Sequence, residues 1–145
     1  MISKTLIKII TVCSLIVGAI LAIPTFFPFI RGFSFVALLF FVAPFIIVYL
    51  KRLEVMKFDE MEKFLISGAI AGATSFIGFS IVYFPITWLL SLIFKIQSFI
   101  WVKVVFSNFA FLIFIIILMA LVSALLNAFS AFLTSYFYYY FGNRK

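Results

Sequence analysis

The sequence has no histidine, one cysteine and few acidic residues, and each shortage excludes a kind of site. Haem cannot be ligated by paired histidines, and the single thiol of Cys13 cannot form an internal disulfide. The four acidic residues all fall in one short stretch: Glu54, Asp59, Glu60 and Glu62. Lysines lie among them, so a carboxylate metal site is not expected there. We therefore expect no metal, no cofactor and no enzymatic activity.

Charge is scarce along the whole chain. Of the 145 residues, 10% are charged and 68% are hydrophobic. A soluble domain carries about a quarter of its residues as Asp, Glu, Lys or Arg, so this chain could not cover its surface in water. Its apolar residues instead form unbroken runs long enough to cross a bilayer as helices. The polar–apolar alternation of a membrane β-barrel is missing. The sequence therefore predicts an all-α integral membrane protein.

The apolar runs predict a four-transmembrane-helix bundle that forms a single membrane domain, residues 1–145. The expected spans are about residues 6–23, 33–50, 60–84 and 104–133, with a loop at 51–59 and an apolar outer segment at 85–103. Lys4 and Lys8 ahead of the first run resemble the start of a signal peptide, but Ala22 lacks the small residue expected two positions before it. We expect an uncleaved signal-anchor; cleavage would leave three spans and an external amino terminus.

Basic residues orient the expected bundle. Eight of them fall on the side of the two termini: Lys4, Lys8, Lys51, Arg52, Lys57, Lys63, Arg144 and Lys145. Only Arg31, Lys95 and Lys103 fall on the other side. Because cytoplasmic loops carry an excess of Lys and Arg, we expect the N- and C-termini to be cytoplasmic. We expect the protein to lie in the cell inner (plasma) membrane. Basic residues at span ends anchor to lipid headgroups, so no nucleic-acid partner is expected.

The third apolar run is too long for one perpendicular crossing. Residues 64–94 carry no charge, and a helix of that length would measure about 45 Å at 1.5 Å per residue. The hydrocarbon core is only about 30 Å thick. Pro85 lacks a backbone N–H, and its ring opposes continuation of a helix. We therefore expect the third span to be kinked or ended near Pro85, followed by a hydrophobic hairpin or, alternatively, a short interfacial or re-entrant helix.

Asp59 and Glu62 predict where the third helix begins. Their spacing is that of a capping box in which Asp takes the place of Ser or Thr. Both carboxylates would also lie near the positive end of the helix dipole. We favour this structural role over acid–base chemistry by the two carboxylates.

Small residues follow one side of the third span. They are Ser67, Gly68, Ala71, Gly72, Ser75 and Gly78. Small residues let two helix backbones approach closely in a membrane, and Gly68 and Gly72 have the spacing of a GxxxG pair. We favour packing inside the bundle; self-association or docking of a partner helix is the alternative.

Asn127 and Asn108 are the most polar residues of the fourth apolar run. Asn127 lies among small residues, so we expect it to face the bundle and to hydrogen-bond another helix. Its candidate partners by residue type are Thr11, Ser14, Thr74 and Ser75. A substrate-binding role for Asn127 is secondary, and Asn108 is expected near the outer headgroups. The aromatic run at residues 136–141 is typical of a membrane-interface belt.

These features favour a non-enzymatic subunit or assembly factor that acts through lateral helix–helix contacts. Its partners would be the lipid bilayer and either a second copy or another membrane protein. The alternative is a transporter or channel for an uncharged or lipidic small molecule, with bends at Pro44 and Pro85. Ionisable residues inside spans normally mark proton and ion pathways. No such residue lies clearly inside an expected span.

Overall fold

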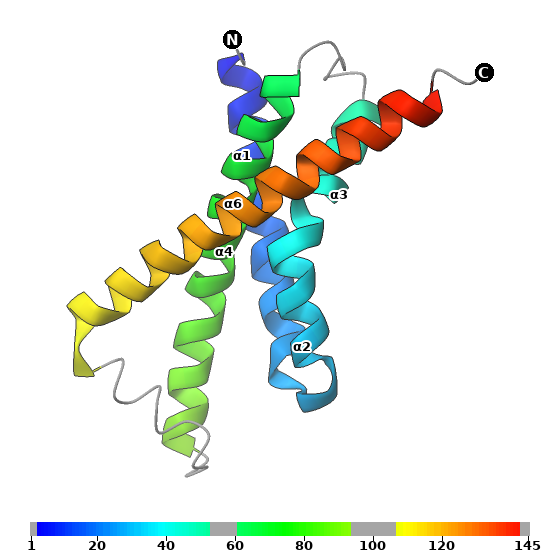
Figure 1. Cartoon of the computed structure of the whole chain (residues 1–145). Helices are drawn as coiled ribbons and strands as arrows, with labels where there is room; N and C mark the ends of the chain where they lie inside the picture. Colours follow the sequence, from blue (N-terminus) through cyan, green and yellow to red (C-terminus); the bar gives the residue numbers. More distant parts are fainter. Residues whose placement is uncertain (1–2, 53–60, 94–106, 143–145) are drawn as a thin grey trace.

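Four long helical segments cross one another in a computed structural model of the chain, which describes residues 3–52, 61–93 and 107–142 (Figure 1). The first consists of α1 (Lys4–Ala22) and the 3₁₀ turn η1 (Ile23–Phe26). The second joins α2 (Pro28–Val36), the π-helical segment η2 (Ala37–Phe41) and α3 (Val42–Arg52). The third and fourth are the continuous helices α4 (Met61–Ile93) and α6 (Phe109–Gly142).

Each of the four segments is long and apolar enough to cross a membrane. The spans are Lys4–Phe26, Pro28–Arg52, Glu62–Ile93 and Phe109–Phe141. The described ranges contain helices and no strand, so the predicted all-α fold with four spans is confirmed. The start of α1 and the end of α6 lie at the same end of the molecule (Figure 1), as an even number of spans requires. The chain is therefore a multi-pass membrane protein.

The first two spans begin where the sequence offers helix-start signals. The Ser3 side chain accepts a hydrogen bond from the Leu6 backbone N–H at 3.2 Å and caps α1. The second span begins at Pro28, earlier than the expected residue 33. Proline suits the first turn of a helix because its missing N–H would have no partner there.

The third span does not end at Pro85. Helix α4 continues to Ile93, so residues 86–93 belong to the helix rather than to an outer segment. Of the two forms expected, the end at Pro85 is wrong, and the kink at Pro85 stays a prediction. In lipid, neighbouring groups and Ser/Thr hydroxyls can compensate for the backbone bond that a proline removes. Near Pro85, the Ser80 hydroxyl donates to the Phe76 carbonyl at 2.8 Å, and the Thr87 hydroxyl donates to the Tyr83 carbonyl at 2.6 Å. Both polar side chains are therefore bonded within α4, although neither bonds to the Ile81 carbonyl, which loses its usual donor to Pro85. The rest of the expected outer segment, 94–103, lies outside the described residues.

The fourth span extends further than its apolar run predicts. Asn108 caps the start of α6, because its Oδ1 accepts from the Phe111 N–H at 3.2 Å and its carbonyl accepts from the Leu112 N–H at 3.1 Å. The helix then passes the expected end at residue 133 and includes the aromatic run up to Gly142. No proline interrupts this stretch, and the hydroxyls of Thr134 and Ser135 bond to carbonyls of the same helix.

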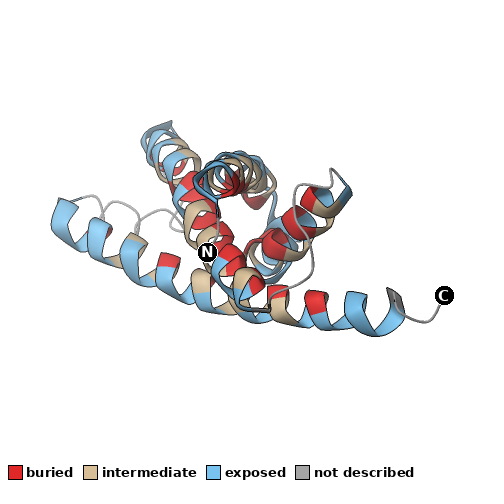
Figure 2. Cartoon of the chain, turned by 90° about the horizontal axis from the view of Figure 1, so that it is seen from above, coloured by how far each residue is buried: buried red, intermediate tan, exposed pale blue. Residues whose placement is uncertain are grey.

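Helix α4 is central to the packing, because it contacts both α1 and α6 along much of its length. Buried residues lie where the helices face one another, whereas α6 is exposed along most of its length (Figure 2). Away from the centre, an aromatic cluster joins α4 to η1 and α2. The Tyr83 ring stacks on Phe79 at 5.1 Å and on Phe26 at 5.7 Å between ring centroids, and Phe35 lies 5.4 Å from Phe79. Each such pair adds about 0.5–1.5 kcal/mol to the burial of its surface.

Candidate functional site

Gly68 and Gly72 bring α4 against α6 of the same chain. A Cβ atom at Gly68 would lie 2.5 Å from the Ala131 Cβ and 2.7 Å from the Asn127 carbonyl oxygen. At Gly72 it would lie 2.7 Å from the Asn127 Cβ and would overlap the Ser123 carbonyl. The two glycines are thus occupied by a contact within the chain, and their contact with a partner helix stays a prediction.

The next part of the same small-residue side of α4 meets α1 in the same manner. A Cβ atom at Gly18 would overlap the Ser75 carbonyl, and one at Gly78 would overlap the Leu15 carbonyl. Beside this crossing, the hydroxyl oxygens of Ser14 and Thr74 share a hydrogen bond of 2.6 Å. The first and third spans are therefore in backbone contact, and one side-chain bond joins them.

The remaining small residues of the third span are also buried in the bundle. Ser67, Ala71 and Ser75 each have at most 2% of their surface exposed. The Ser75 hydroxyl donates to the Gly72 carbonyl at 3.0 Å. Within residues 3–52, 61–93 and 107–142, the Ser67 hydroxyl is the one buried side-chain oxygen without a hydrogen bond.

Asn127 is fully buried, and its amide enters an opening in the backbone of the second span. The side-chain Oδ1 accepts from the Ala43 backbone N–H at 2.9 Å. The Nδ2 group donates to the carbonyl oxygens of Leu38 at 3.0 Å and Leu39 at 2.9 Å. It also lies 3.1 Å from the Ser123 carbonyl of its own helix. One side chain thus supplies both a donor and an acceptor to a neighbouring helix.

The opening exists because the second span departs from α-helical geometry just before Pro44. The π-helical turn of η2 widens the backbone, and Pro44 has no N–H to donate. In an α-helix, the Ala43 N–H would bond to the Leu39 carbonyl. Here Asn127 bonds to both groups. An unsatisfied backbone group in the bilayer costs several kcal/mol, so the amide stabilises a break that lipid alone would disfavour.

The expected partners of Asn127 are wrong. Ser14 and Thr74 bond to each other, and Ser75 bonds within its own helix. Residue type indicates only side chains that could bond to Asn127, whereas its observed partners are backbone groups of the second span. The sequence did carry a usable signal, because Pro44 leaves part of a buried helix without a donor.

Ser123 extends this arrangement to the third span. Its hydroxyl donates to the Gly72 carbonyl at 2.9 Å. Gly72 of α4, Ser123 and Asn127 of α6, and the backbone of η2 and Ala43 therefore meet at one place, which we call the Asn127 junction. The junction fixes three of the four spans relative to one another by hydrogen bonds as well as by close packing.

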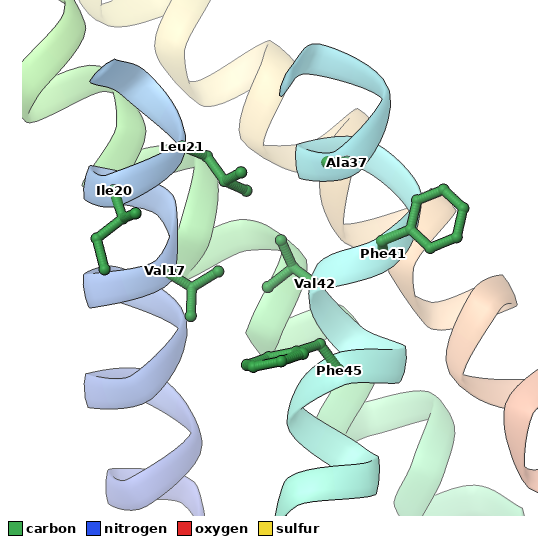
Figure 3. Close-up of a pocket in the computed structure, with 7 residues that line it drawn as sticks. All are labelled: Val17, Ile20, Leu21, Ala37, Phe41, Val42 and Phe45. Atoms are coloured by element: carbon green, nitrogen blue, oxygen red, sulfur yellow. The ribbon is translucent and has the colours of Figure 1, made fainter. Parts of the chain in front are cut away.

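An apolar groove of about 400 Å³ lies between α1 and the second span. Its lining residues are Val17, Ile20, Leu21, Ala37, Phe41, Val42 and Phe45. In Figure 3, Val17 and Leu21 face Val42 across the groove, and the Phe45 ring reaches toward α1, whereas the Phe41 ring points away. Because no polar side chain lines it, this space suits a hydrocarbon chain rather than an ion or a polar solute.

The expected helix cap is described only in part. Glu62 lies in the first turn of α4, where its charge suits the helix dipole. Asp59 lies outside the described residues, as do Lys95, Lys103 and Trp101. In the portion of the chain that the structure describes, no three His, Cys, Asp or Glu side chains gather as a metal site would require.

The sequence matches no protein-family model, and neither a curated protein nor a solved structure matches the chain. The class of protein therefore follows from its own architecture. It is a helical membrane protein with four spans, and its third span packs against both the first and the fourth.

Proposed function

We propose that this protein is a non-enzymatic subunit or assembly factor of a membrane complex, and that it acts through lateral contacts between helices. The observation that carries this proposal is the course of α6, which packs on the bundle only through one stripe. The buried residues of this helix are Leu112, Ala120, Ser123, Asn127, Ala131 and Ser135. In Figure 1 the two ends of α6 extend past the other helices.

The length of α6 explains this course. Its 34 residues measure about 51 Å at 1.5 Å per residue, whereas the hydrocarbon core is about 30 Å thick. A helix with such an excess tilts in the bilayer. Helix α4, with 33 residues, is nearly as long. Because the two long helices cross rather than run side by side, their ends separate (Figure 1). The separated parts then present apolar side chains to lipid or to another protein.

One place where α6 separates from the bundle is a groove of about 420 Å³ beside α4. It is lined by Ile77, Ser80, Ile81, Phe84, Pro85, Leu112 and Ile116. Association of helices in a membrane depends on van der Waals packing, and a third helix that fills the angle between two diverging helices gains contacts with both. This groove is where we propose that a partner helix binds.

The bonding of the buried polar groups in the described residues also favours contact over transport. The buried hydroxyls of Ser75, Ser80 and Ser123 bond to backbone carbonyls, and the Asn127 amide is engaged at the junction. A water or solute path would need polar groups that face a shared cavity. In addition, we propose that the basic side of the protein is cytoplasmic and that the membrane is the inner (plasma) membrane.

Co-purification from native membranes tests the proposed function. Ile81→Trp would fill the groove beside α4, and Ile81 is 61% exposed, so the substitution leaves the bundle interior unchanged. Leu125→Trp is the matched control, because Leu125 is 73% exposed on α6 and lines none of the described grooves. We expect the wild type and Leu125→Trp to elute in mild detergent with a stoichiometric partner that Ile81→Trp loses. A wild-type protein that elutes as a monomer would contradict the proposal.

A transporter or channel for an uncharged or lipidic molecule is the second candidate. The interruption of the second span by η2 and Pro44 favours it, because broken helices are common at transporter binding sites. Its test is flux in liposomes: the wild type should move a fluorescent lipid between leaflets faster than protein-free vesicles do. Val17→Trp, which fills the apolar groove of Figure 3, should slow that movement. Equal rates with and without protein would reject this candidate.

A further inference from the structure

An open pocket of about 410 Å³ lies between the C-terminal ends of α3 and α6. Lys51 contributes its one basic lining side chain, and the other lining residues are Phe137, Tyr138 and Phe141. In Figure 1 the last turns of α6 lie at the end of the molecule that also holds both chain termini. The pocket therefore combines an ammonium group with an apolar aromatic wall.

The geometry of Lys51 shows how the charge is held. Its Nζ lies 3.8 Å from the centroid of the Tyr138 ring, which is a cation–π arrangement. Arg52 follows it at the end of α3 and is exposed. Two adjacent basic residues thus end the second span, and one of them is supported by an aromatic ring of the fourth span.

The position of the pocket along the spans indicates what it meets in a membrane. Arg52 is the last residue of the second span, and Phe141 is the last residue of the fourth. The pocket consequently lies where acyl chains give way to headgroups, the level at which aromatic residues and Lys or Arg are enriched. Basic pockets between transmembrane helices bind anionic lipid headgroups.

The lining restricts the occupant further. A small water-soluble anion would make no use of Phe137 and Phe141, and an uncharged apolar molecule would make no use of Lys51. An anionic glycerophospholipid uses both, because its acyl chain is apolar and its phosphate charge is not balanced by a cation in its own headgroup, as it is in phosphatidylcholine. We propose that this pocket binds one anionic glycerophospholipid, with the phosphate on Lys51 and the acyl chain against Phe137 and Phe141. This binding is independent of any protein partner.

Native mass spectrometry of the full chain in mild detergent tests the proposal. The protein is titrated with phosphatidylglycerol and, separately, with phosphatidylcholine of the same acyl chains. We expect one phosphatidylglycerol to be retained with about fivefold higher affinity, the order of magnitude for one basic residue at an anionic membrane surface. Lys51→Gln should abolish the preference, and Lys51→Arg should keep it. Lys8→Gln removes a positive charge from exposed α1 at the same side and should leave the preference unchanged.

Three outcomes would overturn the proposal. Equal retention of both lipids by the wild type would show that the pocket does not select an anionic headgroup. A preference that persists in Lys51→Gln would place the selection elsewhere. Inorganic phosphate that binds as tightly as phosphatidylglycerol would show that the acyl chain plays no part. If Lys51→Gln does not yield folded protein, Phe141→Ala serves as the second test: it removes part of the apolar wall at a side chain that is 61% exposed, and it should lower the affinity for phosphatidylglycerol.

Discussion

The side-chain Oδ1 of Asn127 accepts a hydrogen bond from the backbone N–H of Ala43 at 2.9 Å, although the two residues belong to different spans. The same amide donates to the Leu38 and Leu39 carbonyls. These three bonds satisfy backbone groups of the second span that have no α-helical partner near Pro44. The fourth span is thus bound to the second at a point where the second would otherwise expose polar backbone inside the membrane.

Asn127→Leu should destabilise the fold. The substitution keeps the number of side-chain heavy atoms and removes the bonds to Leu38, Leu39 and Ala43. Interhelical hydrogen bonds in membrane proteins average about 0.6 kcal/mol each, so three of them predict a loss of about 2 kcal/mol. Unfolding by SDS from mild-detergent micelles, followed by circular dichroism, measures the loss. Leu125→Ala, on an exposed face of the same helix, is the control and should change the stability by less than half as much. If Asn127→Leu is as stable as the wild type, the amide does not stabilise the fold.

Pro44→Ala should reduce the effect of losing Asn127. Alanine restores a backbone N–H four residues after Phe40, so the second span can return to α-helical bonding across η2. Fewer backbone groups of the second span then need a hydrogen bond from the Asn127 amide. A double-mutant cycle with Asn127→Leu should give a coupling of about 1 kcal/mol, since the two residues act on one network. Additive losses would mean that Pro44 and Asn127 are energetically independent.

The bond between Ser14 and Thr74 should contribute a smaller amount. Thr74→Val keeps the side-chain shape and removes the hydroxyl that pairs with Ser14 at 2.6 Å. Each hydroxyl has one proton and also lies within hydrogen-bond distance of a carbonyl of its own helix, so the bond between them competes with those bonds. The loss should therefore be about 0.6 kcal/mol, the average for such bonds in a membrane. The same SDS titration measures it, and Ser14→Ala in the Thr74→Val background should add little. A second loss of equal size would show that the two hydroxyls do not act as a pair.

Composition and charge sufficed to predict the number of spans, because long apolar runs have one stable solution in lipid. The same reasoning misplaced the end of the third span. Proline disfavours the interior of a helix in water. Inside the bilayer, however, a backbone that leaves a helix has no water to bond with, so α4 continues past Pro85 to Ile93. The apolar run likewise predicted an end of the fourth span at residue 133, before the aromatic belt. Nothing in the aromatic run opposes a helix, and α6 includes it.

The partner of Asn127 depended on information that is not local. A buried amide in a span must bond to something, and that much follows from the sequence. Which helix it meets depends on where α6 crosses the bundle, and this crossing is fixed by Gly68 against Ala131 and by Gly72 against Ser123. The π-helical turn at η2 could not be foreseen either, because it arises from Pro44 and Asn127 together rather than from residues 37–41.

Gly72→Ala should destabilise the crossing of α4 and α6, and Gly32→Ala provides a control with the same chemical change. At Gly72 an added methyl group would lie 2.7 Å from the Asn127 Cβ and would overlap the Ser123 carbonyl, so the helices must separate. Overpacking of this kind costs about 1–3 kcal/mol. At Gly32, in α2, no atom lies within 4 Å of an added Cβ, so the higher helix propensity of alanine should leave stability unchanged or raise it by up to about 1 kcal/mol. The two SDS unfolding curves should therefore shift in opposite directions or only one should shift. A Gly72→Ala protein as stable as Gly32→Ala would show that the close approach of α4 and α6 is not required for the fold.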